Sequence, residues 1–136
     1  MYMSSHVVVI GGGAAGLESA IQLAREGIAV SLIEKQDKTG GHLNDWYQLF
    51  PDRRDSREIL DYFSDVASAA NIKIHLNTLV TSVVKNRDRF SVITDKAGEL
   101  KADAVIVSSG FDLFRSSRKE EYGYGIYDNV FTSADL

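Results

Sequence analysis

The segment that most constrains the fold is a strand-like run followed at once by spaced glycines. Residues 6–10 (HVVVI) form a short β-branched run, typical of a strand buried on both faces. Residues 14–26 carry apolar side chains at helical spacing, and Gly27 is placed to end a helix. Residues 28–33 (IAVSLI) form a second apolar run. A strand–helix–strand unit this short predicts two parallel strands joined by a crossover helix.

The glycines follow the spacing GxGxxG at Gly11, Gly13 and Gly16. Gly11 permits the tight turn, Gly13 lets the backbone approach a pyrophosphate, and Gly16 lets the helix pack close to the strand. The N–H groups at the helix start, around Ala14 and Ala15, then face the phosphate charges with the positive end of the helix dipole. The pattern predicts a dinucleotide-binding turn.

An acidic residue narrows the choice of dinucleotide. Glu34 ends the second predicted strand, 18 residues after Gly16. A carboxylate at this position accepts hydrogen bonds from ribose hydroxyls and repels a 2′-phosphate. The predicted ligand is therefore FAD or NAD rather than NADP.

The rest of the chain completes a single domain. Residues 34–54 show no clear period and are predicted as a long ordered loop, and Asp55 with Glu58 predicts the start of a helix. Further strands are predicted at 72–76 and 104–107, a meander at 79–85, 89–94 and 99–102, and a final strand at 129–132. The expected fold class is α/β: a Rossmann-type domain over residues 1–136, with a central parallel sheet, helices on its faces and a three-stranded β-meander.

Composition excludes several classes of function. The chain has no cysteine, so it holds no disulfide, redox-active dithiol, thiolate nucleophile or Cys-ligated iron–sulfur cluster. The net charge is −4 without a basic cluster, which argues against nucleic acid as a partner. The three histidines are far apart, and no metal site is expected. No apolar run reaches the ~20 residues of a membrane span, and a cytoplasmic location is expected.

Residues 7–43 resemble the N-terminal motif of the glutathione-reductase-like flavoproteins, in which a Gly-Gly pair follows the glycine turn and the acid. The resemblance implies FAD as the cofactor, with NAD as the alternative, because NAD-binding domains of that superfamily usually lack the pair. It implies that the cofactor-binding residues of this region include Glu34, Lys35, Gly40, Gly41, His42 and Leu43. His42 follows the pair and is expected near the flavin or its phosphates.

Two further matches add residues to the expected site. Residues 102–110 (ADAVIVSSG) are similar to the family strand that ends in Ala-Thr-Gly, which adds Ser109 and Gly110. Val80 matches the position whose backbone pairs with the adenine in these enzymes.

The tail carries a more specific resemblance. Residues 110–136 are similar to the A subunit of heterodisulfide reductase, above all in the phrase RKEEYGYG at 118–125. Many members of that family carry a Cys-rich, ferredoxin-like insertion and continue beyond this segment, so the domain is expected to be truncated relative to full-length members. Tyr122, Tyr124 and Tyr127 are expected to pack the tail onto the sheet.

Together these features predict the FAD-binding domain of a flavin-dependent oxidoreductase similar to heterodisulfide reductase A. The alternatives are an NAD-binding domain of the same superfamily and a non-catalytic nucleotide-binding module. No residue is predicted as a catalytic acid, base or nucleophile, and the isolated chain is expected to bind FAD without turnover. We expect NAD(P)H and a partner subunit for electron transfer to act through the full-length protein.

Overall fold

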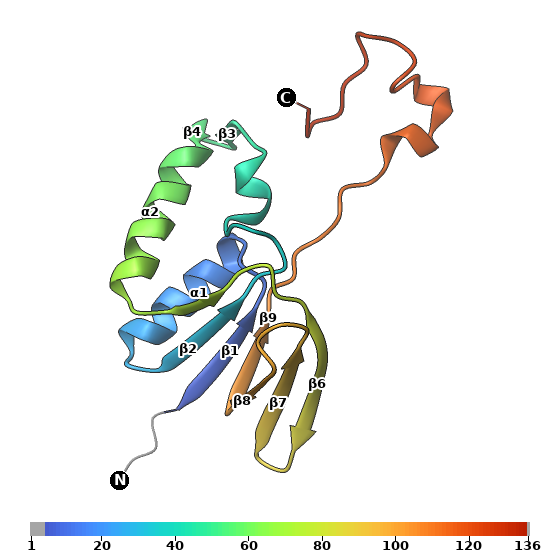
Figure 1. Ribbon diagram of the computed structural model, residues 1–136. Coiled ribbons are helices and arrows are strands. Elements are labelled where there is room, and N and C mark those ends of the chain that lie inside the picture. Colours follow the sequence, from blue (N-terminus) through green and yellow to red (C-terminus); the bar gives the residue numbers. More distant parts are fainter. Residues whose placement is uncertain (1–4, 136) are drawn as a thin grey trace.

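The computed structural model describes residues 5–135 and contains the predicted parallel sheet (Figure 1). Strand β1 (His6–Ile10), helix α1 (Ala14–Arg25) and strand β2 (Ala29–Ile33) form the strand–helix–strand unit, with β1 and β2 parallel. Strand β5 (Lys73–His75) pairs with the outer edge of β2, and β9 (Ala104–Val107) pairs with the other edge of β1. The order is β5-β2-β1-β9, so β1 lies in the interior of the sheet.

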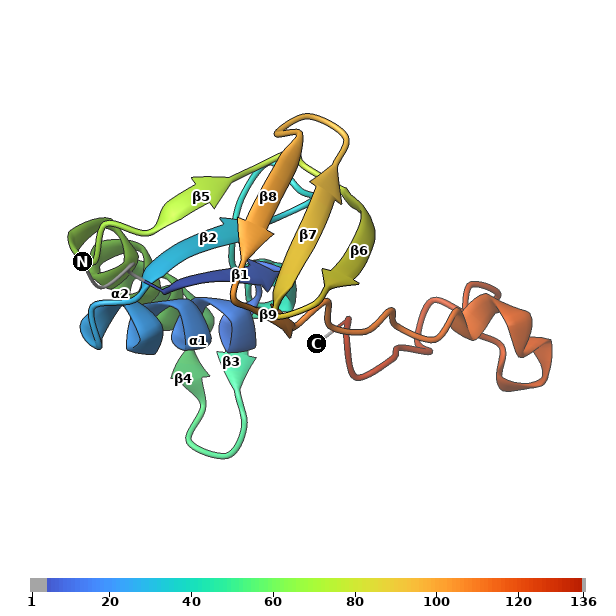
Figure 2. The ribbon, with the colours of Figure 1, turned by 90° about the horizontal axis from the view of Figure 1, so that it is seen from below.

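The two faces of the sheet are covered by different structures (Figures 1 and 2). Helices α1 and α2 (Ser56–Ala69) pack on one face, and the antiparallel meander packs on the other. The meander consists of β6 (Val80–Asn86), β7 (Arg89–Thr94) and β8 (Glu99–Ala102), as predicted. Helices were expected on both faces. The structure differs because the connection from β5 to β9 is made by the meander instead of a helix.

Alternation along the strands produces two separate cores. Val7 and Val9 of β1 face the helices, whereas Val8 between them faces the meander. The helix-side core also contains the buried residues Val30, Leu32, Leu17, Ala20, Ile21, Phe63 and Ala67. The meander-side core contains Ile33, Val92 and Ala102. A strand buried on both faces needs apolar residues at successive positions, which explains the run HVVVI.

The loop predicted at 34–54 has more structure than expected. It contains a 3-10 turn, η1 (Gly41–Asn44), and a two-stranded antiparallel ribbon made by β3 (Gln48–Leu49) and β4 (Arg54–Asp55). The predicted start of α2 is confirmed, because the Asp55 side chain accepts a hydrogen bond from the Arg57 N–H at 2.8 Å. Glu58 bonds to Arg54 at 2.7 Å instead of completing a capping box.

The tail after residue 110 does not pack on the sheet. It leaves the end of β9 and extends away from the body through two short 3-10 turns, η2 (Ser116–Arg118) and η3 (Glu120–Tyr122) (Figures 1 and 2). The strand expected at 129–132 is not formed, and the expected packing of the tyrosines is wrong: Tyr122 is 71% exposed and Tyr127 63%. The physical reason is that the helices and the meander already cover both faces of the central strands.

Candidate functional site

Two of the three motif glycines are required by the fold itself. Gly11 has a φ of +104°, and a Cβ at this position would overlap the Ser108 carbonyl. A Cβ on Gly16 would overlap the Gly11 carbonyl oxygen, because the start of α1 lies directly against the turn. Both roles match the predictions for these glycines.

Gly13 is different, because the protein has room for a side chain there. Its backbone is extended, with φ −72° and ψ −176°, and a Cβ would meet no atom within 4 Å. Gly13 lines a cavity at the carboxyl edge of the sheet. Backbone geometry and packing do not require a glycine here, which leaves the preference for glycine at an N-cap and the contents of the cavity as reasons. A ligand that approaches the backbone closely is such a reason.

The start of α1 is suited to an anion. Its first helical hydrogen bond runs from the Leu17 N–H to the Gly13 carbonyl at 2.9 Å, so the N–H groups of 14–16 have no acceptor within the helix. No side chain caps this end, and the first turn contains no acidic residue. Ala14 and Ala15 line the cavity. The positive end of the helix dipole therefore faces the cavity without an acidic side chain in its own first turn.

Glu34 lies at the end of β2 with only 6% of its surface exposed. Its Oε2 accepts a hydrogen bond from the Gly12 N–H at 2.7 Å, and its Oε1 accepts one from the Gln36 N–H at 2.8 Å. Each carboxylate oxygen has a second lone pair, so the group can still accept from ribose hydroxyls. The carboxylate thus also holds the glycine turn against the loop after β2, a role that the sequence motif did not suggest.

Replacing Glu34 by glutamine is expected to lower the free energy of unfolding by about 1–3 kcal/mol, the range for a buried polar group left unpaired. The amide keeps the size of the side chain but places an NH₂ group against the N–H of either Gly12 or Gln36. Denaturant unfolding measures the change. Glu99→Gln, at an exposed position of β8, is the control. Equal stability of the two variants would contradict the structural role of Glu34.

The Gly-Gly pair packs directly on the glycine turn. The Gly40 N–H donates to the Gly12 carbonyl at 2.7 Å, and Gly13 and Gly40 form an isolated parallel bridge. A Cβ on Gly40 would overlap the Leu60 side chain, and a Cβ on Gly41 would lie 3.2 Å from the Gly13 Cα. The resemblance attributed this pair to closeness of the ligand. The structure adds reasons within the protein, because a Cβ on Gly41 would press on the turn and a Cβ on Gly40 would press on α2.

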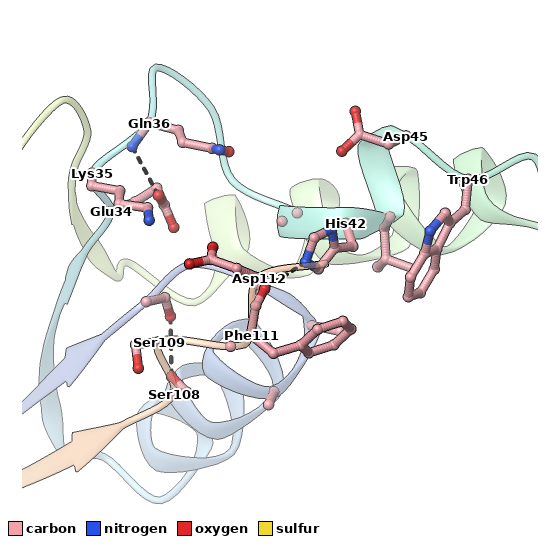
Figure 3. A pocket seen from close by; sticks show the side chains of 18 residues that line it. Glu34, Lys35, Gln36, His42, Asp45, Trp46, Ser108, Ser109, Phe111 and Asp112 are labelled. Atoms are coloured by element: carbon pink, nitrogen blue, oxygen red, sulfur yellow. Dashed lines mark hydrogen bonds between the residues drawn. The ribbon is translucent and has the colours of Figure 1, made fainter. Parts of the chain in front are cut away.

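The other end of the cavity is aromatic. His42 Nε2 lies 2.8 Å from the Phe111 carbonyl oxygen. The His42 ring stacks on Trp46, with centroids 5.6 Å apart and an interplanar angle of 12°, and lies 4.7 Å from the Phe111 ring. Figure 3 shows these side chains at one end of the cavity and Glu34 with Lys35 at the other.

Most of the predicted site residues come together in this cavity of about 290 Å³. Those that line it are Gly11, Gly13, Ala14, Ala15, Glu34, Lys35, Gly40, Gly41, His42, Leu43, Ser109 and Gly110. Two do not: Gly16 lies beneath the turn, and Val80, at the start of β6, packs against the meander-side core. The contact of Val80 with adenine stays a prediction.

Six lining residues were missed: Gln36, Asp45, Trp46, Ser108, Phe111 and Asp112. A single tryptophan shortly after the Gly-Gly pair was an available signal for Trp46. Ser108 could have been predicted as well, because it directly precedes the predicted Ser109. Its Oγ donates to the carbonyls of Ile10 and Gly11 at 3.0 and 3.1 Å and so ties the end of β9 to the turn.

Asp103 and His75, beside the sheet, both have lowered pKa values. The His6 N–H donates to the Asp103 carboxylate at 2.8 Å and lowers the pKa of Asp103, and Arg89 lowers this pKa further. Burial lowers the pKa of His75, with a smaller effect from the charge of Lys73. The Asp103 contacts join the meander to β1 and have a structural role.

Two general properties complete the description of the site. In residues 5–135, no group of three or more His, Cys, Asp or Glu side chains is arranged to hold a metal ion. None of the helices in this part of the chain is long and apolar enough to cross a membrane.

The family is shown by a comparison with known proteins. Residues 5–126 match the family described as pyridine nucleotide-disulphide oxidoreductase. The chain belongs to this family. The match contains the glycine turn, Glu34, the Gly-Gly pair and Ser108 to Gly110, so the cavity of this pyridine nucleotide-disulphide oxidoreductase domain lies entirely within the family region. The resemblance to flavoproteins seen in the sequence is confirmed.

Curated relatives include heterodisulfide reductase A subunits, as the tail suggested. The A subunit of the ferredoxin/F(420)H(2)-dependent CoB-CoM heterodisulfide reductase of Methanosarcina acetivorans is 25% identical over 215 residues. The match covers 98% of this oxidoreductase domain and 27% of the relative, so the chain spans about a quarter of that protein. The alignment is longer than the 136 residues of this chain, so the relative has additional residues inside the matched region, consistent with the expected insertion.

Solved structures agree on the fold. Thioredoxin reductase of Lactococcus lactis matches with a TM-score of 0.73 at 23% identity, over 89% of this chain and 41% of that one, which shows the fold alone. A FAD-dependent pyridine nucleotide-disulphide oxidoreductase from Desulfovibrio vulgaris matches with a TM-score of 0.60 at 25% identity, over 80% of this chain and 25% of that one. The Rossmann-type α/β class predicted for this oxidoreductase domain is confirmed.

Proposed function

We propose that this chain binds FAD at the carboxyl edge of its parallel sheet and is the FAD-binding domain of a flavin-dependent oxidoreductase related to heterodisulfide reductase A. The observation that carries the proposal is Gly13, a glycine at a position where the fold has room for a side chain. FAD in particular is supported by the family match and by the Desulfovibrio vulgaris neighbour, whose name states that it depends on FAD.

The cavity offers a matching group for each part of the ligand. The Glu34 carboxylate accepts from the adenosine ribose, and the N–H groups at the start of α1 receive the pyrophosphate. The cavity volume of about 290 Å³ lies just below the ~300–1,000 Å³ usual for small-molecule sites. It suits the adenosine and pyrophosphate part, with the isoalloxazine extending past His42. When bound, FAD supplies the acceptor for a hydride or an electron pair.

We assign the remaining steps of the reaction to the complete protein. The chain spans 27% of the heterodisulfide reductase relative, so we place the sites for NAD(P)H and for an electron-transfer partner subunit outside this chain. The part of the residues described here is to bind and orient the dinucleotide. On this basis the isolated chain binds FAD without turnover.

Calorimetric titration with four nucleotides tests the choice of cofactor. FAD and ADP are expected to bind most tightly and NAD more weakly. NADP is expected to bind at least about tenfold more weakly than ADP, because its 2′-phosphate meets the buried carboxylate of Glu34. NAD is expected to bind more weakly because its second ribose and cationic ring would lie where Gly40 and Gly41 close on the glycine turn. Tighter binding of NAD than of FAD would show that the domain is an NAD-binding one.

A further inference from the structure

One side chain joins the two walls of the cavity. His42 lies on η1, directly after the Gly-Gly pair, and Phe111 lies in the segment after β9. A carbonyl oxygen only accepts, so at 2.8 Å the His42 Nε2 must carry the proton and donate to Phe111. This single bond links two loops that approach the cavity from opposite sides of β1.

The segment after β9 has little else to hold it in place. The Ser108 N–H and Oγ bond to the β1 end, whereas the Phe111 side chain is 60% exposed. Among the hydrogen bonds of residues 5–135, the His42–Phe111 bond is the last one between the body and the tail, since the bonds of 112–135 stay within the tail. The position of this cavity wall therefore depends on His42 and on its stacking with Trp46 and Phe111.

The position of the bond along the cavity indicates which part of a ligand it affects. In Figure 3, Glu34, Lys35 and Gln36 lie at one end of the cavity, and His42, Trp46 and Phe111 lie at the other. The glycine turn and the start of α1 lie between these ends. A ligand whose adenosine is held at Glu34 and whose phosphates lie at α1 reaches His42 only with the part of the molecule beyond its second phosphate.

We propose that His42 is a positioning residue for the flavin half of the dinucleotide, which it serves by holding the Phe111 segment against η1. The proposal rests on the proposed function, since it assumes that the adenosine half lies at Glu34. On this proposal the His42–Phe111 contact contributes to the affinity for complete FAD and not to the affinity for ADP. ADP ends before this wall, whereas FAD must pass it.

The test compares FAD and ADP affinities of His42→Ala with those of the unmodified protein. FAD is expected to bind about tenfold more weakly to the variant, as for loss of a hydrogen bond with its stacked ring, and ADP within about twofold of the original value. His42→Gln retains an N–H donor and is expected to recover part of the FAD affinity. His75→Ala, on the edge strand β5 and outside the cavity, should leave the ratio of FAD to ADP affinity unchanged.

The release of FAD gives a second measurement. Trp46 is the only tryptophan of the chain and stacks on His42, so its emission reports on this end of the cavity. Recovery of Trp46 emission as FAD dissociates is expected to be about tenfold faster in His42→Ala. Equal losses of FAD and ADP affinity, or an unchanged FAD affinity and release rate, would overturn the proposal. Failure of the unmodified protein to bind either nucleotide would instead refute the proposed function.

Discussion

A Gly13→Ala substitution is expected to weaken binding of both FAD and ADP by at least about tenfold. The added methyl group enters the cavity, at the place where we propose that the pyrophosphate approaches the backbone. Overpacking of this kind costs about 1–3 kcal/mol, and 1.4 kcal/mol corresponds to a factor of ten in affinity. Calorimetric titration of the variant with ADP and with FAD measures the loss.

The same variant should remain folded, which separates the role of Gly13 from that of its neighbours. Alanine suits the extended backbone at this position and restricts the unfolded chain, but it is a poorer N-cap than glycine. These opposing effects are expected to keep the free energy of unfolding within about 1 kcal/mol of the original value. Unchanged nucleotide affinity in a folded variant would mean that no ligand lies against Gly13.

The opposite result is expected for Gly16→Ala. Its Cβ would overlap the Gly11 carbonyl oxygen, which belongs to the backbone of the turn and cannot rotate away. The start of α1 would have to separate from β1. The expected loss is about 3 kcal/mol or more of unfolding free energy, a large share of the 5–15 kcal/mol typical of a domain.

Denaturant unfolding measures this loss, and its sign is informative. Glycine-to-alanine changes within helices usually stabilise a protein by up to about 1 kcal/mol, because alanine is the better helix former. Stabilisation of Gly16→Ala would therefore contradict the close packing of α1 on the turn. Gly13→Ala, three residues earlier, is the matched control.

The central unit of the fold could be predicted because its signals are local. All of these signals lie between residues 6 and 34: the apolar run at 6–10, the glycine spacing and the acid at Glu34. Each has a direct steric or electrostatic meaning. The elements that cover each face of the sheet could not be predicted in the same way. An apolar run buried on both sides reads alike whether helices or a meander cover it.

At the aromatic end of the cavity His42 was predicted, but its two neighbours Trp46 and Phe111 were missed for a related reason. Trp46 and Phe111 are far apart in the sequence, and only the parallel arrangement of the strands brings the loops after β2 and β9 to the same edge. The backbone donors of Gly12 and Gln36 were missed because every residue has an N–H group, and no sequence pattern marks those that reach Glu34. The tail was misjudged because its aromatic residues suggested packing, whereas the helices and the meander already cover the central strands of the sheet.

The place of β1 in the sheet has a consequence for how the cavity opens. β1 is bonded on both edges and covered on both faces, so its amide groups become exposed only when the whole domain unfolds. The glycine turn continues directly from this strand, and the Gly11 N–H bonds to the Ile33 carbonyl at 2.8 Å. The segment 111–112 lies in a loop instead, with an exposed Phe111 side chain, and such a segment can open by local unfolding. For the proposed nucleotide, we expect entry and release to involve movement of this segment while the glycine turn keeps its shape.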